Sequence, residues 1–292
     1  MYRNRRYRLI GLLFLAPAVL FVLAFTAFPL GHMAWISLHN WSLISPPKFI
    51  ELGNFERAFA DRQFWVSLGF SLKYTVIITP ILIVGGYLIA LLTAPNTPLR
   101  RFTRTLVFIP VVIGLGASSL LWYWLFSVDY GFVNRILLDL GLLEKPVLWL
   151  GVDADLSNAA IIASVVWKVI GFGMILFIGA IQAIPNEINE AAEVDGASPL
   201  QRVTRITLPL TLRTILLVTL VSVIGSLLAF DQFYIMTAGQ PQNLTATSVF
   251  YVYLHSFPYL RLGYGAALSL ILAVIVLGVT LVQLAVSRRT HA

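Results

Sequence analysis

The chain has 292 residues, of which 59% are hydrophobic and only 11% charged, with a formal net charge of +7. A soluble globular chain carries about 25% charged residues, so this composition excludes an ordinary water-soluble domain and indicates a lipid bilayer as the solvent. Cysteine is absent, which excludes disulfide frameworks, thiol chemistry and metal sites that need cysteine ligands.

Long uncharged runs predict six membrane-spanning helices. The runs 9–47, 74–99 and 262–287 contain no Asp, Glu, Lys or Arg, and each can supply the roughly 20 apolar residues that cross a hydrocarbon core. Because backbone groups cannot stay unpaired in lipid, and the runs lack the short alternation of barrel strands, we expect helices. The predicted fold is all-α and polytopic, with helices near 9–31, 71–93, 105–126, 161–183, 212–235 and 264–287.

The first run follows several arginines, as the apolar core of a secretory signal does. The stretch 9–31 is too long for such a core, and no convincing small-residue cleavage site follows it. We therefore expect an uncleaved first span that Pro17 and Pro29 bend.

Basic residues predict the side of the membrane that each loop occupies. An even number of spans puts both termini on one side, and that side holds more Lys and Arg than the other. The positive-inside rule places that side, and so both termini, in the cytoplasm. These residues form no single groove, which argues against a nucleic-acid partner. The basic residues on the predicted inner side are Arg3, Arg5, Arg6, Arg8, Arg100, Arg101, Arg104, Arg202, Arg205, Arg213, Arg288 and Arg289.

The predicted organisation has three parts. Residues 1–70 hold an N-terminal cytoplasmic tail, the first span and the first external loop. Residues 71–287 form the core transmembrane domain of five helices, which includes a cytoplasmic loop at 184–211. Residues 288–292 are a cytoplasmic tail.

Tryptophan gathers at or near the outer ends of the predicted spans. An aromatic belt at the membrane interface explains this position, and so does a docking surface for an external partner; the sequence leaves both open. The residues are Trp35, Trp41, Trp65, Trp122, Trp124 and Trp149.

The inner loop 184–211 has the signals of two short helices joined by a turn. Glutamates recur at helical spacing within 187–193. Asp195-Gly196 is a turn signal because glycine accepts a positive φ, and Ser198-Pro199 is an N-cap followed by a favoured first helical residue. Such a hairpin below the bilayer suits either insertion into a cytosolic partner or a plain amphipathic connection.

The same loop resembles the EAA loop of permease subunits in bacterial ATP-binding-cassette importers. Glu190-Ala191-Ala192, Asp195-Gly196-Ala197 and Ile206-Thr207-Leu208-Pro209 match that motif in spacing without gaps. Asn189 and Val203 stand where the family commonly has Tyr and Phe, at packing positions. In the family this loop is a coupling helix that docks in a cleft of the ATPase. The resemblance implies that role for Glu190, Ala191, Ala192, Asp195, Gly196, Ala197, Leu208 and Pro209.

Other segments resemble maltose-type carbohydrate permeases, and favour the first of the two permease subunits. Leu15-Ala16-Pro17 is similar to their first span, 52–65 to their first outer loop and 230–267 to their last third. The resemblance implies the type I importer permease fold and transport of a di- or oligosaccharide or a related polyol. It also implies a second permease, two cytosolic ATPases and a periplasmic or lipid-anchored binding protein.

ATP should be used by those separate subunits. The chain contains no Gly-x-x-x-x-Gly-Lys-[Ser/Thr] segment, so we expect it to bind neither ATP nor Mg²⁺. We also expect no catalytic residue, no metal site and no cofactor of its own.

A sugar path needs aromatic faces and hydrogen-bonding side chains in a cavity, where polar groups at membrane depth are tolerated. The resemblance implies that Phe172, Ser222 and Ser226 line such a path. Packing between helices is the alternative for these three, and snorkelling to headgroups is the alternative for Lys168. We further hypothesise that Lys168 and Asp231 pair across the cavity. The full set of candidates is Trp167, Lys168, Phe172, Ser222, Ser226 and Asp231.

An ion-coupled secondary transporter is the main alternative function. It would be expected to show repeated halves, interrupted helices and buried ionisable relays, and only Lys168 and Asp231 are candidates for a relay. A membrane enzyme is disfavoured because the four histidines are scattered and no His-Glu-x-x-His segment occurs.

Overall fold

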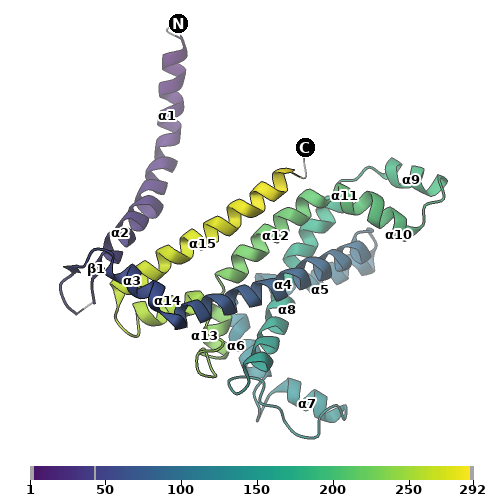
Figure 1. Cartoon of the computed structure of the whole chain (residues 1–292). Helices are drawn as coiled ribbons and strands as arrows, with labels where there is room; N and C mark the ends of the chain where they lie inside the picture. The colour runs from purple at the N-terminus through teal and green to yellow at the C-terminus, as the bar shows by residue number, and fades with distance from the viewer. Residues whose placement is uncertain (1–2, 43, 290–292) are drawn as a thin grey trace. The chain divides into compact units, whose positions relative to one another are not determined.

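The computed structural model describes the backbone of residues 3–42 and 44–289, and the side chains of 10–42 and 44–287. The chain forms two compact units (Figure 1). The first unit is Met1–Arg62 with Val252–Val274, and the second unit is Gln63–Tyr251 with Ile275–Ala292. These units follow contacts and divide the last span at Val274, so they do not test the predicted boundaries at residues 70 and 287, which stay predictions. The predicted basic residues outside the described side chains are Arg3, Arg5, Arg6, Arg8, Arg288 and Arg289.

Up to six segments of the described chain are long and apolar enough to cross a membrane. Four are continuous helices, Ile10–Ser37, Arg62–Thr93, Ala154–Gln182 and Leu262–Ser287. Two more are helix pairs that are bent at a short break. The prediction of six spans and an all-α fold is confirmed, apart from two strands of two residues each, β1 His39–Asn40 and β2 Lys48–Phe49, which pair antiparallel.

The first span contains a local change of helix type. α1 Arg3–Val22 continues into a π-helical turn, η1 Leu23–Ala27, and then into α2 Phe28–Ser37. The backbone N–H of Phe28 donates to the carbonyl of Leu23, which is the wider spacing of a π turn. This turn stands directly before Pro29, whose ring removes a backbone donor. The chain stays helical through Pro17.

The second, fourth and sixth spans are longer than predicted. α4 Arg62–Thr93 and α8 Ala154–Gln182 both begin several residues before the predicted outer ends, and α15 runs over Leu262–Arg289. Asp153 explains the early start of α8, because its carboxylate accepts from the backbone N–H of Leu156 at 2.7 Å as an N-cap. Uncharged runs marked the apolar part of each helix and missed the polar turns beyond it.

The prediction of one continuous third helix is wrong. α5 Pro98–Val112 and α6 Leu115–Leu125 meet at an angle of 101°. Pro110 lacks the N–H that an α-helix needs at this position, and Gly114 takes a non-helical conformation as the N-cap of α6. The proline and the glycine together end one helix and begin another.

The fifth span also differs from the prediction of a helix over 212–235. α12 Leu212–Leu227 ends eight residues early, and a separate short helix, α13 Asp231–Met236, follows a non-helical Phe230. A carboxylate in the first turn of a helix is stabilising, which favours a new start at Asp231. The carbonyl of Ala229, within the break, accepts from the Thr247 hydroxyl at 2.7 Å.

The remaining elements are short and connect the spans. The bends and loops hold α3 Gly53–Ala60, α7 Phe132–Asp139, α9 Asn186–Val194, α10 Pro199–Arg202, η2 Val203–Thr207, α11 Leu208–Leu210 and α14 Ser248–Ser256.

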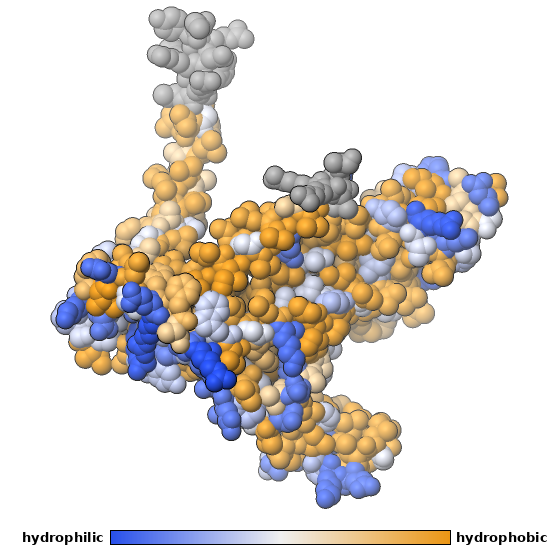
Figure 2. Space-filling view, in the orientation of Figure 1, coloured by the Kyte–Doolittle hydropathy of each residue, from blue (hydrophilic) through white to orange (hydrophobic). Residues whose placement is uncertain are grey.

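α8 is the central helix of the second unit, since α5, α6, α12 and α13 all pack against it. One buried cluster joins Tyr74 and Ile78 of α4 to Ile161 of α8 and Phe233 of α13. A second cluster joins Tyr87 of α4 to Phe177 of α8 and other residues. Apolar residues cover much of the visible surface of these helices, as a lipid-facing surface requires, while the α9–α10 end is more hydrophilic (Figure 2).

Glycine brings α5 and α8 into backbone contact. A Cβ atom at Gly171 would meet the carbonyl of Val107 and the Cα of Phe108, so only glycine allows this approach. Gly179, two turns later on the same helix, has no atom within 4 Å of the equivalent position.

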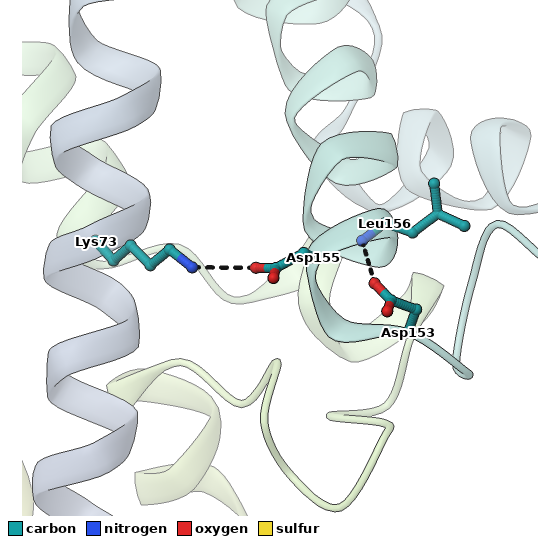
Figure 3. A network of polar contacts seen from close by, with 4 residues as sticks. All are labelled: Lys73, Asp153, Asp155 and Leu156. Carbon is teal, nitrogen blue, oxygen red and sulfur yellow. Dashed lines mark hydrogen bonds and ion pairs between the residues drawn. The ribbon is translucent and has the colours of Figure 1, made fainter.

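The N-terminal end of α8 is joined to α4 by an ion pair. Lys73 Nζ lies 3.0 Å from Asp155 Oδ1, beside the N-cap Asp153 (Figure 3). Both side chains are largely exposed, so the pair contributes little to stability.

One buried asparagine organises the outer loop before α8. Asn134 accepts from the backbone N–H of Val147 at 3.1 Å and from Trp149 Nε1 at 2.9 Å, and donates to the Val147 carbonyl at 3.0 Å. Trp149 therefore belongs to the loop's own structure, whereas Trp35, Trp65 and Trp124 are exposed as a belt or docking surface requires.

The first unit is held by buried polar groups around its last helix. Asn54 donates to the carbonyls of Ser37 and His39 at 2.8 and 2.9 Å. Tyr264 donates to Asp61 at 2.5 Å, and its ring contacts the buried His255 edge-on at 5.0 Å.

His255 makes the first unit sensitive to pH. The pKa of His255 is lowered from 6.5 to about 4, mainly by burial; the nearby Asp61 opposes this shift, and Arg261 and Arg57 add to it. The folded state then binds fewer protons than the unfolded state between these values, so stability is full above pH 6.5 and falls as the pH drops toward 4.

We expect the Gly171→Ala variant to lower the free energy of unfolding by about 1–3 kcal/mol, because the added methyl group pushes α5 from α8. Gly179→Ala on the same helix is the control and should be neutral or slightly stabilising. Thermal unfolding in one detergent measures both. Equal behaviour of the two variants would contradict the close approach.

We expect the unfolding free energy of the protein to fall by about 2 kcal/mol between pH 7.5 and pH 5, because His255 must be protonated on unfolding. His255→Phe should largely remove this dependence. His32→Phe, at an exposed histidine of the same unit, should keep it. Thermal or denaturant unfolding at the two pH values measures this difference. An unchanged pH dependence of the unfolding free energy in His255→Phe would show that His255 is not its source.

Candidate functional site

The segment 184–211 forms the predicted helical hairpin, which we call the inner hairpin. α9 ends in a turn where Gly196 has a φ of 76°. The backbone N–H of Ala197 donates to the carbonyl of Ala192, and that of Gly196 to the carbonyl of Glu193. These two bonds are a Schellman motif, in which the αL position favours glycine. The turn predicted at Asp195-Gly196 is confirmed.

The second arm of the inner hairpin begins at a capping box. Ser198 accepts from the backbone N–H of Gln201, and the Gln201 side chain accepts from the backbone N–H of Ser198 at 2.8 Å. An ion pair between Glu193 and Arg202 joins the two arms. The hairpin therefore has a defined shape and is more than a loose connection.

The exposed tip of the inner hairpin carries apolar side chains. Val194 is 88% exposed and Leu200 is 73% exposed, on either side of the turn. Of the predicted coupling residues, Glu190, Ala191, Asp195 and Gly196 are exposed, Ala197 is partly buried, and Ala192 is buried. The hairpin thus presents a mixed polar and apolar surface around the tip.

The return of the hairpin into the bundle is anchored to α4. The exposed Leu208 and Pro209 lie in α11, and the chain then bends by 68° into α12. At the bend the Tyr87 hydroxyl lies 2.8 Å from that of Thr211, which donates to the Thr207 carbonyl.

A cavity of about 220 Å³ lies within the second unit, between α4, α8, α12 and the segment before α13. Four predicted path residues line it, namely Phe172, Ser222, Ser226 and Asp231. The structure thus brings together aromatic, hydroxyl and carboxylate groups from two spans, as a sugar-sized polar solute requires.

Two of these polar groups have unused hydrogen-bonding capacity. In the described part of the chain, the Ser222 hydroxyl and the Asp231 carboxylate form no hydrogen bond or ion pair with protein. Ser226 donates to the carbonyl of Val223 at 3.1 Å, so its hydroxyl retains acceptor capacity. A solute in the cavity meets both a donor and acceptors.

Trp167 and Lys168 do not line the cavity. Trp167 packs edge-on against Trp122, with ring centroids 5.7 Å apart. Lys168 is buried, and its Nζ donates to the carbonyl of Val111 at 3.4 Å. The hypothesised Lys168–Asp231 pair is not formed among the described residues, since the Lys168 amine is directed to the Val111 carbonyl of α5.

Sequence reasoning missed several lining residues. Tyr74 of α4 and Gln232 of α13 are both buried and line the cavity. Phe230 and Leu115 line it from the two helix breaks. Gln232 next to Asp231, at the end of an uncharged run, was an available signal, whereas Leu115 becomes visible only once the third span is known to be broken.

Known proteins resemble this chain in sequence over most of its length. The family model described as binding-protein-dependent transport system inner membrane component matches residues 82–292. The trehalose/maltose transport system permease protein MalF of Thermococcus litoralis is 33% identical over 283 residues, covering 96% of this chain and 94% of the relative. The sulfoquinovosyl glycerol transport system permease protein SmoG of Agrobacterium fabrum is 31% identical, covering 96% and 91%.

A solved structure has the same fold. A chain of the bacterial alginate ABC transporter in complex with an alginate-bound periplasmic protein superposes with a TM-score of 0.86 at 24% identity, covering 99% of this chain and 97% of that one.

We expect the variant Ser222→Cys to react with a water-soluble thiol reagent, because Ser222 lines the cavity. The chain has no native cysteine, so the label reports a single site. Val218→Cys, one turn earlier on α12 and 2% exposed, is the control and should stay unlabelled. Labelling of both, or of the control alone, would show that the cavity is misplaced.

Proposed function

Because this chain belongs to the family of binding-protein-dependent transport system inner membrane components, we propose that it forms half of the path through which an ATP-binding-cassette importer moves a di- or oligosaccharide or a related polyol. Membership makes it a multi-pass protein of the inner membrane and a transport subunit, not an enzyme. The main support for a carbohydrate substrate is the cavity that Phe172, Ser222 and Asp231 line.

The chemistry of the cavity suits a carbohydrate. Phe172 and Phe230 offer ring faces to the C–H side of a sugar, and Ser222, Ser226 and Asp231 offer partners for its hydroxyls. The named substrates of the two relatives, trehalose or maltose and sulfoquinovosyl glycerol, support a glycosidic substrate. Asp231 favours a neutral glycoside over an anionic one such as the substrate named for SmoG, because like charges repel in a site of low dielectric.

The inner hairpin is the docking element for the ATPase in this proposal. Val194 and Leu200 present exposed apolar side chains next to Glu190 and Asp195, and exposed apolar groups rimmed by polar ones are typical of a protein interface. Two cytosolic ATPases use ATP and Mg²⁺, and one of them receives this hairpin.

The assembly has four further components. A second homologous permease completes the path, two ATPases bind below it, and a periplasmic or lipid-anchored binding protein delivers substrate from outside. The alginate-bound periplasmic protein in the complex of the structural neighbour supports the last. The excess of basic residues on the predicted inner side, such as Arg104 and Arg202, supports a cytoplasmic position for both termini.

An ion-coupled transporter is the less favoured function. Such a mechanism needs buried ionisable groups that exchange protons or ions, and Lys168 is bonded to a backbone carbonyl instead of facing Asp231. Family membership also favours an ATP-driven importer.

The hairpin residue Glu190 tests the proposal. In the assembly purified with its ATPase and loaded binding protein, we expect Glu190→Ala to lower oligosaccharide-stimulated ATP hydrolysis at least about tenfold, equivalent to about 1.4 kcal/mol of docking free energy. Glu187→Ala, one turn earlier and also exposed, is the matched control and should stay near the wild-type rate.

Stimulation by neutral oligosaccharides and not by amino acids is the expected substrate result. If no ATPase co-purifies, or if Glu190→Ala and Glu187→Ala behave alike, the hairpin is a plain connection and the importer proposal fails.

A further inference from the structure

The break in the third span leaves backbone carbonyls without helical partners. The last carbonyls of a helix accept no intrahelical bond, and in hydrocarbon each unpaired group is strongly unfavourable. At the end of α5, the Pro110 carbonyl accepts from the N–H of Ile113 at 3.2 Å. The Val111 carbonyl needs a donor from elsewhere in the protein.

Lys168 of α8 supplies that donor. Its Nζ lies 3.4 Å from the Val111 oxygen, at the long end of the hydrogen-bond range, so attraction between a cationic side chain and the negative helix terminus adds to the bond. The side chain is 8% exposed, which excludes snorkelling to headgroups. Gly171, one turn later, keeps α5 close enough for the contact.

The contact stands next to the cavity. Leu115, the first residue of α6 beyond the break, lines the cavity together with Val165, Val169 and Phe172 of α8. The position of Leu115 depends on where α5 ends and at what angle α6 leaves. Lys168 touches the carbonyl four residues before it.

We propose that Lys168 is a positioning residue for the substrate path, and that its amine caps α5 and so fixes Leu115 in the cavity wall. The proposal rests on the proposed function in taking this cavity as the path. It assigns Lys168 neither a substrate contact nor an ion pair, and it explains why a buried amine is tolerated at membrane depth.

The experiment uses the cysteine-free chain as background. Leu115 and Leu228 both line the cavity, from different parts of the chain, and are exposed to a similar extent, 43% and 44%, so Leu115→Cys and Leu228→Cys are matched probes. We expect Lys168→Met to change the thiol-labelling rate of Leu115→Cys about threefold or more, within the range of coupling between packed elements. The Leu228→Cys rate should stay unchanged, because Leu228 directly follows α12, whose end does not depend on the cap.

Lys168→Arg keeps a donor that reaches the carbonyl, so its Leu115→Cys rate should stay near that of the parent. If Lys168→Met does not fold, Lys168→Gln replaces it as the variant with a shorter neutral donor, and an altered Leu115→Cys rate is again expected. A folded Met or Gln variant with unchanged labelling overturns the proposal. Equal changes at Leu115→Cys in the Arg and Met variants also overturn it.

Labelling is measured on the purified permease, without ATPase or sugar, so it is independent of the proposed function. Oligosaccharide uptake by the full assembly then tests the path. We expect Lys168→Met to lower uptake while the ATPase still co-purifies. Shifted labelling with full uptake overturns the link between Lys168 and the path, and loss of the ATPase from the parent assembly instead contradicts the importer function.

Discussion

Backbone hydrogen bonding in a medium without water is the constraint on which the rest of this structure depends. Continuous helices satisfy it by themselves, and the two breaks that border the cavity do not. At the break between α5 and α6, Lys168 donates to the Val111 carbonyl, and at the break after α12, Thr247 donates to the Ala229 carbonyl. Both breaks line the cavity. A cavity at membrane depth exists because side chains replace the missing helical bonds.

The cavity and the inner hairpin are parts of one mechanical unit. α8 carries Phe172 in its wall and leads directly into the hairpin, and the hairpin leads into α12, which carries Ser222. At the same end, the Ala94 carbonyl accepts from Arg104 and from Gln182, which ties the ends of α4, α5 and α8 together. The hairpin is therefore connected along the chain to both helices that carry these cavity residues.

The sequence predicted what local chemistry decides. Uncharged runs located the spans, Asp195-Gly196 and Ser198-Pro199 located the turn and the second arm, and the resemblance to known permeases pointed to Ser222 and Ser226. The helix breaks were missed because hydrophobicity shows that a segment is apolar and not whether its helix is straight. Pro110 and Gly114 could have indicated the break in the third span. Lys168 was assigned to the path because helical spacing gives a face, while the carbonyl that it caps depends on a break in another span.

The most direct test of the account is a cryo-electron microscopy map of the complete importer in a lipid nanodisc with a neutral oligosaccharide bound. The account predicts sugar density against Phe172, Ser222 and Asp231, with the third span bent between Val112 and Leu115. Sugar density elsewhere in this subunit, or a straight helix through that break, would contradict it.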